Sequence, residues 1–270
     1  MAHVETAFAK LNLALHVRSR REDGYHELET LFAFVDKGDV LTARPAARDE
    51  VRVVGEFAPG LTDPFGNLVS EALGVLPRAD GLSVTLEKNL PVAAGLGGGS
   101  ADAGAVFRIV RDRHGLPADW QARASRLGAD VPACVESVPC IGRGTGTTLE
   151  PIRNDLTGTP ALLVNPRAPL STGAVFAGWD GVDLGAMTGG TMRQIALAGR
   201  NDLEAPAIAL CPAVGEVLAA LRRTSAWLVR LSGSGATCFA LFDDVALRDE
   251  AAAAVKRDWP GWWTLAGALR

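Results

Sequence analysis

The sequence predicts an α+β protein made of two domains. Its 270 residues exceed the roughly 100–150 residues of one typical domain. Segments with the two-residue period of strands and segments with the helical period of 3.6 residues are mixed in both halves of the chain. Residues 143–160 are rich in Gly, Thr and Pro, which favours a boundary between the two halves at this place.

The first half begins with an expected strand over residues 4–17, which carries Lys10 and Asn12 among apolar neighbours. Asp23 and Gly24 then form a common hairpin signal. Further strands are expected at residues 28–35, 40–43, 51–54 and 82–86. Helices are expected from residue 67 to a stop at residue 77, after residue 100, over residues 118–127, and from residue 130 onward.

The second half repeats this mixture of strands and helices. Strands are expected over residues 161–164, 227–231, 237–242 and 262–266. Helices are expected over residues 201–209, 214–221 and 246–256. The sequence contains no internal repeat and no low-complexity tract, so each half reads as a compact α+β domain.

The composition indicates a globular protein without a nucleic-acid or membrane partner. Hydrophobic residues make up 48% of the chain and charged residues 21%, with a formal net charge of −4. The short basic cluster of Arg18, Arg20 and Arg21 is followed by acidic residues, as in a solvated loop. We expect neither a signal peptide nor a membrane span of about 20 apolar residues. The four cysteines form no C-x-x-C pair, which favours reduced thiols in a cytoplasmic protein.

A run of glycines stands between an expected strand and an expected helix, in the order GLGGGS over residues 95–100. Glycine lets the backbone adopt positive φ and lets its N–H groups approach a ligand closely. The start of the helix adds unpaired N–H donors and the positive end of the helix dipole. Ser100 adds a hydroxyl that could cap the helix or reach a phosphate oxygen. The arrangement predicts a phosphate-binding loop.

Other glycine loops fit this segment less well. A Walker loop requires a lysine before its final Ser or Thr, and Gly99 precedes Ser100 here. A dinucleotide-binding G-x-G-x-x-G fingerprint lacks its last glycine, because Ser100 stands at that position. A flexible turn without a ligand remains an alternative, although so many glycines before an apolar helix would then only add conformational entropy to the unfolded chain.

Two motifs resemble those of the GHMP kinases, a family named after galactose, homoserine, mevalonate and phosphomevalonate kinases. The sequence PVAAGLGGGSADA at residues 91–103 resembles the P-x-x-x-G-L-G-G-G-S-S/A-x-A loop of the family. The sequence LSGSGAT at residues 231–237 is similar to the third family motif, a glycine turn that packs against the first. The two motifs together are highly specific, and the resemblance implies an ATP-dependent small-molecule kinase.

Further segments are similar to one branch of the family, the enzymes that phosphorylate the 2-hydroxyl of 4-diphosphocytidyl-2-C-methyl-D-erythritol in the non-mevalonate route to isoprenoid precursors. These segments are AKLNL at residues 9–13, DGYHELETLF at 23–32, GADVP at 128–132 and NDLE at 201–204. The resemblance runs from about residue 7 to the C-terminus. It implies a first domain, residues 1–152, like domain 2 of ribosomal protein S5 and a ferredoxin-like second domain, residues 153–270.

The resemblance also implies a catalytic pair. Asp130 is expected to accept the proton of the substrate hydroxyl, and Lys10 is expected to stabilise the charge that develops during transfer. From the residues alone, Asp130 before Val131 and Pro132 is equally a helix N-cap, and both roles can hold at once. Lys10 from the residues alone could be an ordinary lysine of an edge strand.

The substrate is expected to carry a cytidine diphosphate group. By the resemblance, Tyr25 and Phe176 stack on the two faces of the base, and the imidazole of His26 bonds its edge. Asn12 and Thr172 are expected to bind the polar remainder of the substrate. Without the family, Phe176 could as well be a core side chain.

The nucleotide is expected to lie on the glycine loop and on two further side chains. Asn67 and Lys88 match family positions near the adenine, although the residues alone also suit a helix cap and a solvated strand end. The loop residues expected at the nucleotide are Pro91, Val92, Ala93, Ala94, Gly95, Leu96, Gly97, Gly98, Gly99, Ser100 and Ala101.

The chain departs from the family pattern at two places. Ala101 stands where the family often has a second serine, so one phosphate or metal contact could be missing. Arg143 stands where the family often has an acidic residue. We therefore expect Mg²⁺ to arrive with ATP and assign it no protein ligand.

Three other functions stay open at this point. Another GHMP kinase that acts on a sugar or a mevalonate-like alcohol would have no base to stack on Tyr25. A catalytically silent nucleotide-binding sensor would be free to lose Lys10 or Asp130, and both are present. An RNA-binding protein is disfavoured by the acidic balance of charge. The sequence leaves the choice between a monomer and a homodimer open.

Overall fold

The computed structural model describes residues 2–61 and 67–270, which form two compact units that are each discontinuous in sequence. The first unit consists of Met1–Lys10, Lys37–Val92 and Gly97–Val138. The second consists of Leu11–Asp36, Ala93–Leu96 and Pro139–Arg270. They interleave because the two longest strands, β1 (His3–Arg20) and β2 (His26–Ala46), contribute residues to both. A domain boundary near residue 152 stays a prediction.

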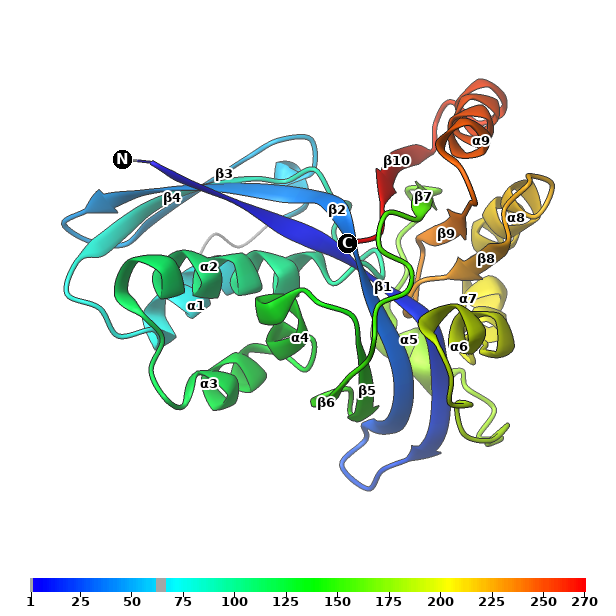
Figure 1. Ribbon diagram of the computed structural model, residues 1–270, viewed down its shortest axis with the longest axis horizontal. Helices are drawn as coiled ribbons and strands as arrows, with labels where there is room; N and C mark the ends of the chain where they lie inside the picture. Colours follow the sequence, from blue (N-terminus) through cyan, green and yellow to red (C-terminus); the bar gives the residue numbers. More distant parts are fainter. Residues whose placement is uncertain (1, 62–66) are drawn as a thin grey trace. The chain divides into compact units, whose positions relative to one another are not determined.

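The first unit is a small sheet with helices gathered on one side of it (Figure 1). Its strands are the N-terminal part of β1, the C-terminal part of β2, β3 (Glu50–Val54) and β4 (Gly81–Glu87). Strand β4 pairs antiparallel with β2 and parallel with β3. The helices are η1 (Ala58–Gly60), α1 (Leu68–Val75), α2 (Gly98–His114), α3 (Trp120–Leu127) and α4 (Val131–Glu136).

Helix α2 is the centre of the first unit and packs against both α1 and α4. Ten consecutive residues of α2, from Ala101 to Val110, are buried, so the helix is enclosed nearly all round over this length. Gly104 allows the close approach of α4, because a Cβ at this position would lie 2.5 Å from the carbonyl oxygen of Cys134. The close packing holds the start of α2 in a fixed place.

The second unit contains a four-stranded antiparallel sheet in the order β10-β7-β9-β8. The strands are β7 (Pro160–Asn165), β8 (Leu228–Leu231), β9 (Cys238–Leu241) and β10 (Trp263–Ala268). The helices are α5 (Thr172–Ala177), α6 (Met192–Ala198), α7 (Glu204–Leu210), α8 (Pro212–Leu221) and α9 (Val245–Asp258). Helices lie after β7 and after β9, so the order of elements is the βαββαβ pattern expected of a ferredoxin-like half.

The core of the second unit lies between this sheet and its helices. It contains Val164 and Ala240 from the strands, Val217 from α8, and Val255 from α9, all buried. Leu162 and Val164 of β7, and Cys238 and Ala240 of β9, face it at two-residue spacing. The expected α+β class is confirmed in both units.

Most expected strands and helices are present, and one detail of the N-terminal strands differs. The hairpin at Asp23 and Gly24 is confirmed, with Gly24 at φ +84°. The strands expected at 28–35 and 40–43 are one continuous strand, β2. The chain does not turn at Gly38, where even a Cβ would lie 1.8 Å from the carbonyl oxygen of Ala7.

The Gly-rich stretch after residue 143 was expected to be a boundary, and part of it is instead a hairpin of β5 (Cys140–Gly144) and β6 (Thr148–Pro151). Its glycines supply turn geometry, since Gly144 and Gly146 both have positive φ. Two short helices, α5 and α6, were not expected. Both start at capping side chains, Ser171 and Thr191, but they are too short to show a helical period in the sequence.

Among residues 2–61 and 67–270, no helix has the length and apolar character required to cross a bilayer. All four cysteines are buried, and none of them forms a disulfide within the described chain.

The packing of α2 on α4 predicts opposite effects for two glycine-to-alanine substitutions. Gly104→Ala should lower the free energy of unfolding by about 1–3 kcal/mol, because the added methyl group would overlap backbone atoms of α4. Gly74→Ala, in α1, should raise it by up to about 1 kcal/mol, because no atom lies within 4 Å of the added group. Denaturant unfolding of both variants measures the difference, and equal effects would contradict the described packing.

Candidate functional site

The glycine loop, defined as residues 91–101, has a backbone that few side chains could accept. Ala93, Gly95 and Gly97 have φ of +52°, +75° and +61°. A Cβ on Gly95 would lie 2.2 Å from the carbonyl oxygen of Ser232, and a Cβ on Gly97 would lie 3.0 Å from Cε of Lys10. At Gly95 backbone atoms leave no room for a side chain, and at Gly97 the positive φ and the adjacent Lys10 side chain favour glycine.

Helix α2 begins inside this loop, earlier than expected from the sequence. Gly97 is its N-cap and Gly98 its first residue, so Gly98, Gly99, Ser100 and Ala101 form the first turn. In the described chain no side chain caps this end. The first N–H groups of a helix have no partner within the helix and carry the positive end of its dipole. The start of α2 is therefore suited to an anion.

The second glycine segment contacts the first in the way that the resemblance implies. The hydroxyl of Ser232 donates to the carbonyl oxygen of Gly95 at 2.7 Å, and the N–H of Thr237 donates to that of Ala94 at 3.1 Å. The backbone N–H of Asn12 also donates to the Ser232 hydroxyl, at 3.4 Å. Ser232 thus joins β1 to the middle of the glycine loop, a role that sequence analysis did not assign to it.

Within the first unit, Lys10 and Asp130 form an ion pair. Lys10 Nζ lies 2.8 Å from Asp130 Oδ2, with the lysine side chain 5% and the aspartate side chain 33% exposed. The lysine side chain runs directly past Gly97, so the pair lies beside the start of α2. A partly exposed carboxylate held by a buried ammonium can be reached by a ligand, and the ammonium fixes its orientation.

Asp130 precedes α4 but does not cap it through its side chain. Its backbone is helical, with φ −82° and ψ −14°, and the carboxylate makes no cap hydrogen bond. Lys10 takes the carboxylate instead. Of the two roles that the residues alone left open, the structure supports a carboxylate directed at Lys10.

Within the second unit, three rings lie together. The ring centroids of His26 and Phe176 are 5.1 Å apart, and those of His26 and Trp179 are 5.8 Å apart in an edge-to-face arrangement. His26 and Trp179 are buried, Phe176 is half-buried, and Tyr25 is 65% exposed. The structure therefore brings His26 and Phe176 together and leaves the ring of Tyr25 in solvent. Trp179 is a member that sequence analysis missed.

The imidazole of His26 is held as a neutral group. Burial, and then the positive charge of Arg20, lower the pKa of His26 below its ordinary value. Arg20 Nε lies 3.4 Å from Nε2 of the ring and donates to it, so this nitrogen carries the lone pair. A neutral ring among aromatic neighbours suits contact with an uncharged base.

Two polar residues predicted at the substrate are engaged with neighbours in the second unit. Asn12 Nδ2 donates to the hydroxyl of Thr30 at 2.8 Å, and Thr30 in turn donates to the carbonyl oxygen of Ala14 at 2.8 Å. The hydroxyl of Thr172 lies 3.0 Å from that of Ser234. These bonds fix the side-chain positions of Asn12 and Thr172.

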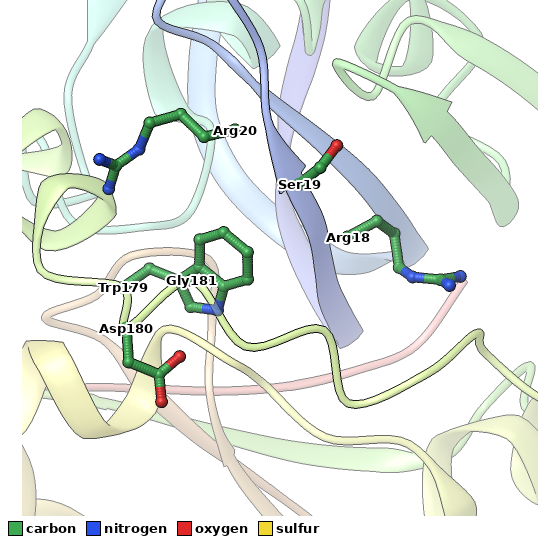
Figure 2. Close-up of a pocket in the computed structure, with 6 residues that line it drawn as sticks. All are labelled: Arg18, Ser19, Arg20, Trp179, Asp180 and Gly181. Carbon is green, nitrogen blue, oxygen red and sulfur yellow. The ribbon is translucent and has the colours of Figure 1, made fainter.

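A hollow of about 280 Å³ lies next to the aromatic cluster (Figure 2). Arg18, Ser19 and Arg20 of β1 form one part of its lining, and the segment from Trp179 to Gly181 forms the other. The guanidinium groups of the two arginines extend in different directions (Figure 2). Arg18 is paired with Asp183 at 2.8 Å and Glu29 at 3.2 Å.

The two residues predicted near the adenine differ in their surroundings. Asn67 caps α1, with Oδ1 accepting from the N–H of Val69 at 2.9 Å. Its Nδ2 is buried and has no hydrogen-bond partner among the described residues. Lys88 is not at a solvated strand end, because it is 2% exposed and bonds two buried carboxylates. Its contact with a nucleotide stays a prediction.

Among residues 2–61 and 67–270, His3, Glu5 and Asp112 offer possible metal-ligand atoms that lie within 4.8 Å of one another. The other oxygen of Glu5 accepts from Arg108 at 2.8 Å, and this guanidinium opposes a second cation at the same carboxylate. The group lies on the strand end and α2, and we assign it no metal.

Comparison with known proteins gives the family. The family model described as "GHMP kinases N terminal domain" matches residues 67–140, and the model described as "GHMP kinases C terminal" matches residues 186–261. The 4-diphosphocytidyl-2-C-methyl-D-erythritol kinase of Novosphingobium aromaticivorans is 71% identical, over 98% of this chain and 92% of that protein. The kinase of the same name from Erythrobacter litoralis is 62% identical, over 98% and 99%. A crystal structure of 4-(cytidine 5'-diphospho)-2C-methyl-D-erythritol kinase superposes with a TM-score of 0.80 at 32% identity, covering 100% of this chain and 99% of that one. The chain therefore belongs to the GHMP kinase family.

Proposed function

We propose that the protein transfers the γ-phosphoryl group of ATP to the 2-hydroxyl of 4-diphosphocytidyl-2-C-methyl-D-erythritol, a step of the non-mevalonate route to isoprenoid precursors. The observation that carries this proposal is the Lys10–Asp130 ion pair beside the glycine loop of the first unit. Two relatives that are 71% and 62% identical over nearly the whole chain bear the name of this kinase.

The glycine loop and the start of α2 are the proposed site of the triphosphate. Backbone N–H groups in a loop with positive φ, followed by an uncapped helix start, form a concave set of donors for phosphate oxygens. ATP supplies the phosphoryl group, and Mg²⁺ bound to it offsets part of its charge. The unpartnered Nδ2 of Asn67 is a donor for an acceptor nitrogen of the adenine ring.

The transfer requires a place for one proton. The oxygen of the substrate hydroxyl forms a new bond to the γ-phosphorus, the bond from that phosphorus to the bridging oxygen breaks, and ADP leaves. The hydroxyl proton passes to the carboxylate of Asp130. The ammonium of Lys10, 2.8 Å from this carboxylate, stabilises negative charge on the reacting oxygens.

The acceptor side of the proposal rests on the second unit. Asn12 of β1, with its side chain held by Thr30, is a proposed contact to the substrate. The exposed ring of Tyr25 and the ring of Phe176 are the proposed partners of the cytosine faces, with neutral His26 beside Phe176. The hydroxyl of Thr172, fixed by Ser234, is a proposed contact to the polar part of the substrate.

The other candidate functions lack a comparable observation. A kinase for a sugar or for mevalonate has no use for an aromatic cluster that could hold a base. A silent nucleotide sensor would not need an ion pair with an accessible carboxylate. A cytoplasmic location and a monomeric or homodimeric state remain predictions from the sequence.

Substitution of Asn67 separates nucleotide binding from helix capping. Asp is as good an N-cap as Asn, so Asn67→Asp should leave the thermal midpoint of unfolding nearly unchanged. The variant replaces the Nδ2 donor by an acceptor, and the KM for ATP should rise about tenfold or more. Asn67→Ser, which also caps but lacks the amide Nδ2 donor, should show the same increase. An unchanged KM for ATP in both variants would remove Asn67 from the nucleotide site.

ADP release with different alcohols tests the function itself. The purified protein with ATP and Mg²⁺ should release ADP with 4-diphosphocytidyl-2-C-methyl-D-erythritol and show little turnover of mevalonate, homoserine or galactose. Comparable rates with mevalonate would reject the cytidine assignment.

The same assay tests the role of Asp130. Asp130→Asn should lower kcat at least about 100-fold and leave ATP affinity unchanged, because the amide cannot accept the proton. Asp119→Asn, a surface substitution before α3 in the same unit, is the matched control and should retain kcat. Equal losses of turnover and ATP affinity in Asp130→Asn would show a structural role.

A further inference from the structure

Three ionisable side chains of the first unit are buried together, and the proposed reaction uses none of their charges. Asp39 is 0%, Lys88 2% and Asp102 2% exposed. Lys88 Nζ lies 2.5 Å from Asp39 Oδ2 and 2.9 Å from Asp102 Oδ2. Asp39 belongs to β2, Lys88 directly follows β4, and Asp102 lies in α2 just after its first turn. We call these three residues the buried charge cluster.

The cluster fixes the backbone where the chain enters the glycine loop. Asp39 Oδ1 accepts from the N–H groups of Asn89 at 2.6 Å and Leu90 at 2.8 Å, immediately before the loop starts at residue 91. The backbone of Lys88 is held as well, since its N–H donates to Val54 at 2.8 Å. Removal of the Asp39 carboxylate would therefore release two backbone groups and one ammonium at once.

The cluster also touches the far end of the loop, where α2 begins. A Cβ on Gly98, the first residue of α2, would lie 3.4 Å from Lys88 Nζ and 3.8 Å from Asp39 Oδ2. Asp102 is on the same helix, four residues later. The same three side chains therefore contact the chain both where it enters the glycine loop and where α2 begins.

The charges of the buried cluster indicate which of its two carboxyl groups holds a proton. The cluster has one amine and two carboxyl groups, so two ionised carboxylates would leave a buried net charge of −1, which is costly. Asp39 accepts hydrogen bonds from the Lys88 ammonium and from two backbone N–H groups. Asp102 accepts from Lys88 through Oδ2, while its Oδ1 is buried without a partner among the described residues. Asp102 is therefore the acid that keeps its proton.

The electrostatic balance agrees with this assignment. Burial raises the pKa of Asp102 well above its ordinary value, the Lys88 ammonium opposes this, and the neighbouring Asp39 carboxylate adds to it. Burial lowers the pKa of the Lys88 ammonium. Its carboxyl partners outweigh this effect and raise the pKa, so the ammonium stays charged. Lys88 from the end of β4 and Asp39 from β2 are the charged groups that act on Asp102.

We propose that Asp39, Lys88 and Asp102 act as one electrically neutral unit that holds the glycine loop in its phosphate-binding shape, with a proton on Asp102. This inference rests on the proposed binding of ATP at the loop. An ionised Asp102 would place net negative charge inside α2, just behind the N–H groups that are to hold a triphosphate, and would oppose its binding. In this assignment Asp39 and Lys88 are positioning residues for the loop.

The proton is tested directly by carbon-13 NMR of the full-length protein with labelled aspartate carboxyl groups. At pH 7 the wild type should show the signal of one protonated aspartate, and Asp102→Asn should lack it. Asp112→Asn, an exposed carboxylate on the same helix, should retain it and serves as the matched control. A wild type in which every aspartate is ionised at pH 7 would overturn the assignment.

Binding of the β,γ-imido analogue of ATP, measured by calorimetry, tests the positioning role without any turnover. Asp39→Asn should weaken binding about tenfold or more, because it loses the charge that holds Lys88, Asn89 and Leu90. Asp102→Asn, which mimics the protonated acid, should stay within about threefold of the wild type. A loss in Asp102→Asn as large as in Asp39→Asn would contradict a neutral Asp102. If Asp39→Asn does not fold, the NMR signal and the Asp102→Asn affinity still decide.

The pH dependence of stability gives a second readout for the same proton. Because the folded state holds this proton more tightly than the unfolded chain, stability from Asp102 is fully present below the ordinary pKa of aspartate and is lost as pH rises through the raised pKa. Thermal unfolding of Asp102→Asn should lack this decline, and an unchanged decline would contradict the assignment. A protein that binds the ATP analogue as described but does not phosphorylate the cytidine substrate would refute the proposed function and leave this inference intact.

Discussion

The structure depends on one constraint, which is that the chain between β4 and α2 must expose main-chain N–H groups and has no room for a side chain at Gly95. A Cβ added to Gly95 would lie 2.2 Å from the carbonyl oxygen of Ser232, which is too close. Gly97 lies against the side chain of Lys10. Both have positive φ. A loop of this kind is unfavourable in an isolated peptide, because glycine loses much conformational entropy on folding. The surrounding structure has to hold it in place.

Three sets of contacts supply this support. The close packing of α2 on α4 at Gly104 fixes the helix that the loop enters. The buried charge cluster ties the entry of the loop to the first residue and the second turn of α2. The Ser232 hydroxyl and the Thr237 N–H bond the middle of the loop through the carbonyl oxygens of Gly95 and Ala94. A loop held in this way can present its donors without reorganisation when an anion arrives.

The sequence was sufficient for those parts of the protein that local pattern determines. The glycine loop between strand and helix was readable because glycine spacing has a direct backbone meaning, and the periods of most strands and helices were clear. The hairpin of β5 and β6 could not be predicted from the sequence, because glycines occur both in linkers and in tight turns. Residues 36–39 looked like a break in the strand, and only the contact between Gly38 and Ala7 shows why the strand continues.

The candidate site also contains residues that the sequence predicts and residues that only the folded structure reveals. Lys10 and Asp130 were expected from a family resemblance, but they lie far apart in the sequence. Only the folded chain shows that their side chains meet at 2.8 Å. Asp39 and Trp179 carry no local signal at all. Their surroundings are made by segments far apart in the chain, with Asp39 contacting Lys88 and Asp102, and Trp179 contacting His26. A buried charge or ring is recognised only when its partners are in place.

A crystal structure of the protein with a non-hydrolysable ATP analogue tests the central claim most directly. The account predicts phosphate oxygens within hydrogen-bonding distance of the N–H groups of residues 97–100, with the γ-phosphorus beside Lys10 and Asp130. A triphosphate bound elsewhere, with those N–H groups bonded only to the protein, would contradict it.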